Sequence, residues 1–87
     1  MHAMPIKEQV GGFLRRHTGR EGLGETEDVF SAGYVNSLFA MQLVLFVEKS
    51  FGIRVLDGDL DRRNFCSIEA IERFVSAKLA KLSREAV

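Results

Sequence analysis

The fold of this chain is decided by residues 33–52, whose sequence is GYVNSLFAMQLVLFVEKSFG. Asn36 and Ser37 carry short polar side chains, which accept hydrogen bonds from the free backbone N–H groups at a helix start. Gly52 is suited to the left-handed backbone conformation that ends many helices. The stretch therefore predicts a helix that begins at Ser37 and ends at about residues 50–51.

This predicted helix is apolar nearly all the way round. Helical spacing places its apolar side chains on two lines, Leu38, Met41 and Leu45 on one and Ala40, Leu43, Val44, Val47 and Phe51 on the other. Phe39 and Phe46 widen the apolar surface further. A helix of this kind is either central in its fold or exposes a patch for contact with a partner.

Towards the N-terminus, the apolar residues behind Pro5 also recur at helical spacing. Pro5 suits the first turn of a helix, where its missing N–H costs nothing. Gly19 is a suitable residue just past a helix end. We therefore predict a first helix from about Pro5 to His17.

Residues 18–36 contain several glycines and have no clear period. A loop of this length in a small domain is either tied down or mobile. We expect an ordered loop that crosses the bundle, with a short turn near Glu27, and three apolar residues that pack inward: Leu23, Val29 and Phe30.

Beyond Gly52, residues 53–56 are apolar enough for a strand, but no second strand with hairpin signals exists to pair with them. We therefore expect a buried connector. The acidic residues that follow favour a helix N-terminus. They predict a short helix from about Asp59 to Asn64, anchored by Leu60 and Phe65.

Ser67 is a good N-cap for a last helix. The positions that follow it at helical spacing are Ile68, Ile71, Phe74, Val75, Lys78 and Leu79. Three long helices and one short one predict an all-α four-helix bundle. The length of 87 residues fits one domain, residues 1–87, with its core at about 5–82.

Composition excludes several classes of function. The formal net charge is +0 and no polybasic run is present, which argues against nucleic-acid binding. Cys66 is the single cysteine, so neither an internal disulfide nor a cysteine-based zinc site is expected. The longest apolar stretch, residues 38–47, is too short to span a bilayer, and no signal peptide is recognisable. We predict a cytoplasmic protein without membrane attachment.

Three candidate motifs fail on their spacing. Residues 19–24 are glycine-rich but lack the pattern and preceding strand of a dinucleotide fingerprint. Residues 57–61 resemble the start of a calcium loop, but Arg62 and Ile68 occupy the positions where such a loop requires Gly and Glu. His2 and His17 lack the acid and nucleophile spacing of a triad. We therefore expect neither a metal site nor an enzyme.

One set of features fits a known family. Asn36-Ser37-Leu38 opens a helix that contains Glu48 and stops at Phe51-Gly52, and residues 64–71 read NFCSIEAI. Together these features, spread over roughly residues 6–80, resemble the acyl carrier protein family. The resemblance implies a carrier bundle in which Ser37 holds a covalent 4'-phosphopantetheine arm, attached by a phosphopantetheinyl transferase.

The resemblance also implies a docking surface for partner enzymes around the attachment site. Asn36 stands where most of the family has aspartate, and it keeps the capping oxygen but loses the charge. The helix behind it has Phe39, Gln42 and Lys49 where fatty-acid carriers show acidic residues. We expect partners to dock through Asn36 and through apolar contacts with less electrostatic steering, at Leu38, Phe39, Met41 and Leu45.

Residues 35–44, VNSLFAMQLV, resemble the free-standing carriers of specialised polyketide and antibiotic biosynthesis. That likeness implies a three-carbon glyceryl unit as cargo, destined for hydroxymalonyl or methoxymalonyl extender units or for tetronate rings. It implies as partners an acyl-loading enzyme, dehydrogenases or a polyketide synthase acyltransferase, visited by a monomeric carrier. Two alternatives stay open: an aminoacyl or ordinary acyl cargo, and an unmodified helical protein-interaction module.

Overall fold

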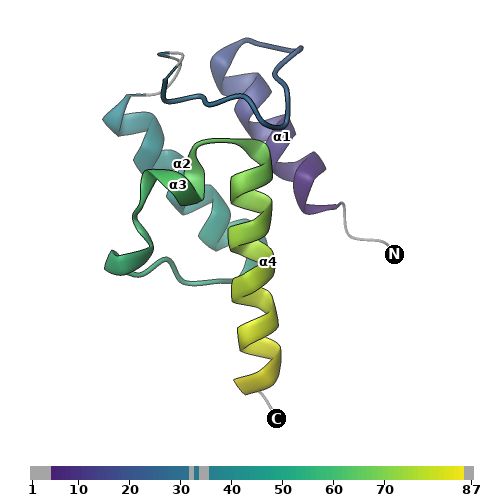
Figure 1. The fold of residues 1–87 in the computed structure, drawn as a ribbon, viewed down its shortest axis with the longest axis vertical. Coiled ribbons are helices and arrows are strands. Elements are labelled where there is room, and N and C mark those ends of the chain that lie inside the picture. The colour runs from purple at the N-terminus through teal and green to yellow at the C-terminus, as the bar shows by residue number, and fades with distance from the viewer. Residues whose placement is uncertain (1–4, 32, 34–35, 86–87) are drawn as a thin grey trace.

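The computed structural model describes residues 5–31, 33 and 36–85, and every regular element among them is helical. In chain order these elements are α1 (Ile6–Thr18), α2 (Ser37–Phe51), a single 3₁₀ turn η1 (Asp57–Asp59), α3 (Arg62–Phe65) and α4 (Ile68–Glu85). Figure 1 shows α4 running along the long axis of the molecule, with α1 and α2 behind it and α3 to its side. The predicted all-α bundle of three long helices and one short one is confirmed.

The ends of α1 and α2 fall within one residue of the predicted limits. Gly19 follows α1 with a φ of 72°, and Gly52 follows α2 with a φ of 65°. Both glycines therefore occupy the left-handed region that other residues enter only at a cost. The Gly52 N–H donates to the Glu48 carbonyl oxygen at 3.0 Å, which closes the last turn of α2.

One hydrophobic core joins the long helices. It is built from buried apolar side chains of α1, α2, α4 and the segments between them: Val10, Phe13, Leu14, Leu23, Val29, Phe39, Leu43, Val47, Ile53, Phe65, Ile68, Ile71, Phe74 and Val75. From α2 the core takes Phe39, Leu43 and Val47, which lie one helical turn apart. Their burial fixes which side of α2 faces solvent.

The loop between α1 and α2 is ordered over its described part, as predicted. Leu23 and Val29 are buried and Phe30 packs against the core. Arg15 Nη2 donates to the Leu23 carbonyl oxygen at 3.0 Å, and the Val29 N–H donates to the Cys66 carbonyl oxygen at 2.8 Å. These bonds attach the loop to α1 and to the entrance of α4.

Two further predictions are confirmed, one within this loop and one at the start of α4. The Glu27 N–H donates to the Gly24 carbonyl oxygen at 3.2 Å, which forms the predicted turn. Ser67 Oγ accepts from the Ala70 N–H at 3.1 Å and caps α4, also as predicted.

The segment between α2 and α4 differs from its prediction. The single helix expected from Asp59 to Asn64 is wrong, because η1 and α3 are separate and Leu60 lies between them. The reason is that each aspartate supplies its carboxylate to a turn of its own. Asp59 Oδ2 accepts from the Leu56 N–H at 3.0 Å, and Asp61 Oδ1 accepts from the Arg63 N–H at 2.8 Å.

Of the two predicted anchors of this segment, one is buried and the other is exposed. Phe65 is buried in the core, as expected. Leu60 is 58% exposed, so it does not anchor the segment. The connector 53–56 is also only partly buried: Ile53 faces the core, whereas Arg54 and Leu56 are exposed.

None of the described helices is long and apolar enough to cross a bilayer.

Candidate functional site

Ser37 is the first residue of α2 and its side chain is exposed. The cap of α2 is Asn36, whose Oδ1 accepts from the Phe39 N–H at 2.9 Å. The Asn36 carbonyl oxygen accepts from the Ala40 N–H at 3.0 Å. Within the described part of the chain, no hydrogen bond involves the Ser37 hydroxyl. The side-chain cap of α2 is thus supplied by Asn36 and not by Ser37.

The start of α2 also suits a negatively charged group. The helix is 15 residues long, and its first turn contains no acidic residue. Its free N–H groups and aligned peptide dipoles place partial positive charge at this end. A phosphodiester on Ser37 would therefore meet a favourable field, and no carboxylate of the first turn would repel it.

An exposed apolar stripe lies directly behind Ser37. Leu38 and Met41 are each 66% exposed and Leu45 is 57% exposed. Their spacing along α2 puts these side chains on one side of the helix. Leu60 lies close to the end of this stripe, since it lines a shallow apolar hollow together with Met41 and Leu45. We call Leu38, Met41 and Leu45 the α2 stripe.

Phe39 does not belong to this exposed surface, which corrects the sequence prediction. It is buried, with its ring centroid 5.7 Å from that of Phe13 and 5.4 Å from that of His17. The physical reason is helical period, because Phe39 shares a face with Leu43 and Val47 rather than with Leu38. That spacing was available in the sequence.

A cleft of about 300 Å³ opens between α2, α3 and the loop before α2. Sequence reasoning did not find it, because its walls come from three segments that only the fold brings together. Most lining residues are apolar and two are charged: Phe30, Ala40, Leu43, Val44, Leu60, Asp61, Arg62 and Phe65. The small side chain of Ala40 among larger neighbours is the one local signal for it.

Arg62 joins α3 to the loop at one end of this cleft. Its Nη2 lies 3.0 Å from Asp28 Oδ2 and also donates to Ser31 Oγ. Its guanidinium carbon lies 5.9 Å from the centre of the Phe30 ring, within range of a cation–π contact. These contacts span more than thirty residues of sequence and hold the loop against α3.

The carboxylate of Asp28 is stabilised in its charged form. The backbone N–H of Ser31 is the main cause that holds the pKa of Asp28 below its usual range. The Ser31 hydroxyl and the Arg62 guanidinium also lower this pKa. Burial raises it, but by less than the backbone hydrogen bond lowers it. Asp28 is therefore charged at neutral pH, as its pairing with Arg62 requires.

Among the described residues, the other side chains capable of chemistry do not form a second centre. His17 is exposed, its Nδ1 lies 3.0 Å from the Phe13 carbonyl oxygen, and its ring stacks on that of Phe13. Cys66 is half-buried. No group of three or more His, Cys, Asp or Glu in residues 5–31, 33 and 36–85 could hold a metal ion. His2, and Tyr34 and Val35 before Asn36, lie outside the described residues.

Comparison with known proteins adds one finding. Over 67 residues the chain is 34% identical to the aminoacyl carrier protein of Agrobacterium fabrum (strain C58). The alignment covers 77% of this chain and 80% of that protein. No protein-family model and no solved structure matches the chain.

Proposed function

Since the chain belongs to the acyl carrier protein family, we propose that it carries an acyl group as a thioester on a 4'-phosphopantetheine arm attached to Ser37. The observation that carries this proposal is the division of labour at the start of α2. Asn36 caps the helix, and the neighbouring Ser37 hydroxyl is exposed. A serine that served only as a cap would not be arranged in this way.

Attachment at Ser37 is a phosphoryl transfer. The Ser37 oxygen forms a bond to the phosphorus of the pantetheine phosphate, while the pyrophosphate bond of coenzyme A breaks and the adenosine bisphosphate leaves. The serine proton passes to a base of the phosphopantetheinyl transferase. The described residues around Ser37 then hold the phosphodiester through the N-terminal N–H groups of α2. When attached, the arm supplies a thiol that binds acyl groups as thioesters.

In this role the chain is a substrate of its partner enzymes and not a catalyst. The α2 stripe supports this view, because a contiguous exposed apolar surface beside the attachment point is typical of an interaction site. We propose that the transferase and the acyl-handling enzymes dock there, with Asn36 at the edge of the contact. The carrier is proposed to be monomeric and to act in the cytoplasm, where coenzyme A is available.

For the cargo, we propose a three-carbon glyceryl-derived unit used in polyketide or antibiotic biosynthesis. The support is the resemblance of residues 35–44 to the free-standing carriers of such pathways. The partners would then be an acyl-loading enzyme, dehydrogenases or a polyketide synthase acyltransferase. An aminoacyl cargo is the second candidate, and the name of the Agrobacterium relative favours it. The mass of the thioester trapped on the carrier in its native host distinguishes the two.

The attachment itself is tested by intact mass spectrometry after incubation with coenzyme A and a broad-specificity transferase. Ser50 offers a matched control, since it is an exposed serine on the same helix. We expect wild type and Ser50→Ala to gain one phosphopantetheine each and Ser37→Ala to gain none. An equal gain on Ser37→Ala, or no gain on wild type, contradicts the proposal. In the second case the unmodified interaction module becomes the better account.

A further inference from the structure

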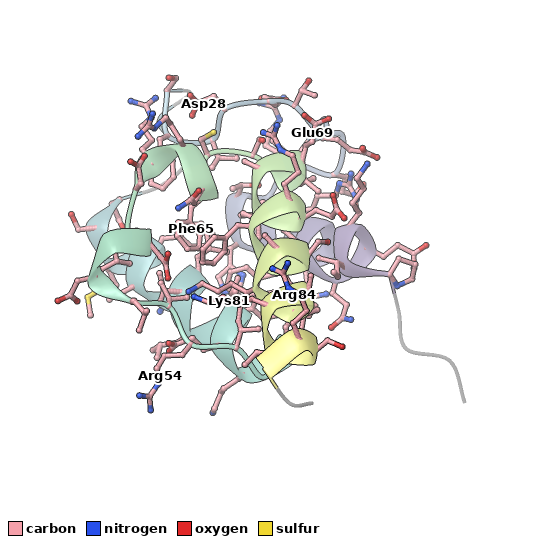
Figure 2. All side chains as sticks on the ribbon, turned by 60° about the horizontal axis from the view of Figure 1, so that its bottom comes forward. Asp28, Arg54, Phe65, Glu69, Lys81 and Arg84 are labelled. Atoms are coloured by element: carbon pink, nitrogen blue, oxygen red, sulfur yellow. The ribbon has the colours of Figure 1, made fainter. Side chains whose placement is uncertain are left out.

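A second exposed surface lies at the other end of α2 from Ser37. It consists of Arg54 and Leu56 from the connector after α2, and Lys81, Leu82 and Arg84 from the end of α4; we call these residues the basic end surface. Figure 2 shows Arg54, Lys81 and Arg84 on the side of the molecule where α4 ends. A hollow of about 210 Å³ joins the two segments, lined by Ile53, Arg54, Leu56, Lys78, Lys81 and Leu82.

The apolar part of this surface has no partner within the described chain. Leu56 is 53% exposed and Leu82 is 46% exposed. Every described residue of α4 from position 80 to position 84 is exposed, so the last turns of this helix extend past the core. Figure 1 shows this end of α4 projecting beyond the other elements. A helix end without tertiary packing is only marginally stable, and a docked partner would stabilise it.

The charged part of the surface carries more cationic than anionic side chains among the described residues. Among the described residues, no ion pair involves Arg54, Lys81 or Arg84. Carboxylates also lie nearby. Asp59 is engaged by Lys78 at 2.5 Å and by the Leu56 N–H, and it also interacts electrostatically with Lys81. Glu48 accepts from the Val55 N–H at 2.8 Å, and Asp57 is exposed in η1. The chain as a whole has a formal net charge of +0, so this surface is a local excess of positive charge.

The α2 stripe offers no comparable charge. Its three residues are apolar, and the first turn of α2 has no acidic residue. Oriented charges steer association and select partners, whereas apolar contacts mainly supply affinity. Of these two surfaces, the basic end surface is therefore the one whose charges can attract and orient a partner.

We propose that the basic end surface is a second docking site, which binds an acidic amphipathic segment of a partner protein. Apolar side chains of that segment cover Leu56 and Leu82 and enter the hollow between them, and its carboxylates pair with Arg54, Lys81 and Arg84. A protein segment fits better than a membrane. Lipid-binding polybasic clusters have about four to eight cationic residues, and this surface has fewer free ones around only two leucines.

The position of the basic end surface gives it a role beyond the proposed function, because it lies away from Ser37. Its 15 residues make α2 about 22 Å long, so a segment bound past its C-terminal end leaves Ser37 and the α2 stripe free. A partner held there would meet the attachment site as a tethered neighbour, at a raised effective concentration. Binding at this surface does not require a modified Ser37.

The test uses the unmodified full chain labelled with ¹⁵N and a synthetic peptide of about 16 residues, long enough to form a helix. The peptide carries leucines along one helical face and glutamates elsewhere, and a second peptide has glutamine in place of every glutamate. Chemical shifts are followed during titration with each peptide. We expect saturable changes at Leu56, Lys81 and Leu82 with the acidic peptide, and much weaker binding of the glutamine peptide.

Two matched double variants localise the charge effect. Arg54→Glu/Lys81→Glu reverses the surface, and Arg16→Glu/Arg73→Glu makes the same change in net charge at exposed positions elsewhere. We expect the first to raise the dissociation constant of the acidic peptide at least about tenfold and the second to change it little. Circular dichroism, together with unchanged loading of Ser37, checks that both variants are folded.

The remaining outcomes each overturn the proposal. They are shifts centred on the α2 stripe, equal binding of the two peptides, equal weakening in both double variants, and no saturable change. Vesicles of phosphatidylglycerol and phosphatidylcholine are tested in parallel by sedimentation. If they bind the chain where the acidic peptide does not, the surface is a membrane contact instead. Failure of Ser37 loading in wild type would contradict the proposed function and leave this result unaffected.

Discussion

The two apolar sides of α2 are made of similar residues and have opposite environments. Leu43 is fully buried on one side, while Leu38 and Leu45 on the other are mostly exposed. Their hydrophobicity is the same, so the difference comes from position round the helix. The buried side is what the fold uses, and the exposed side is a surface that folding alone does not explain.

The largest expected effect is a difference in protein stability between the same substitution made on the two sides of α2. Leu43→Ala removes a fully buried side chain and should lower the free energy of unfolding by about 2–5 kcal/mol. Leu45→Ala makes the same chemical change on the α2 stripe and should stay within about 0.5 kcal/mol of wild type. Urea unfolding followed by circular dichroism measures both. Equal losses would show that Leu45 packs in the folded state, which removes the basis for a docking stripe.

The next effect compares the two residues at the start of α2. Asn36→Ala removes the side-chain cap on the Phe39 N–H and should cost about 1 kcal/mol. Ser37→Ala should change the free energy of unfolding by less than about 0.5 kcal/mol, because this side chain makes no described hydrogen bond. Thermal unfolding of the two variants provides the comparison. A larger loss in Ser37→Ala would identify Ser37 as the cap and weaken the case for attachment there.

Local sequence signals were enough for the long helices. Gly19 and Gly52 end α1 and α2, and Ser67 caps α4, because these conformations depend on the residue itself and its nearest neighbours. The error at Asp59–Asn64 arose where two aspartates each capped a separate turn. Whether two adjacent caps serve one helix or two separate turns depends on the tertiary contacts that hold the segment.

The site was less predictable than the fold. Ser37 and the α2 stripe lie on one helix, so their proximity follows from sequence spacing. The cleft beside Arg62 depends on a loop and on α3, which are far apart in sequence, and no local pattern encodes their contact. The basic end surface likewise joins Arg54 to Lys81 only through the fold. The burial of Phe39, in contrast, is predictable from sequence, because helical period places it on one face with Leu43 and Val47.

Two neighbouring arginines of α3, beside the cleft that α2 lines, offer a finer comparison. Arg62 pairs with Asp28 of the loop at one end of the cleft, whereas Arg63 pairs with Asp61 in its own turn. Arg62→Ala should therefore speed amide hydrogen exchange at Phe30 and Ser31 several-fold, while Arg63→Ala should leave that exchange unchanged. Mass spectrometry of exchanged peptides that cover the loop measures the difference. If the two variants behave alike, exposed ion pairs contribute nothing to holding the loop.

The smallest expected effect concerns how the stability of the fold changes at acidic pH. Hydrogen bonds from the Arg63 side chain, and next from its backbone N–H, lower the pKa of Asp61 to about 2. A group with a lowered folded-state pKa adds stability above its unfolded value, about 3.9, and that stability disappears as the pH falls through the folded value. Asp61→Asn should thus lower the urea midpoint slightly at pH 6, and the difference from wild type should shrink towards pH 2. Asp57→Asn, which alters an exposed aspartate of the adjacent η1 turn, is the control and should show no such convergence. A difference that is the same at both pH values would mean that Asp61 acts through its hydrogen bonds alone, without its charge.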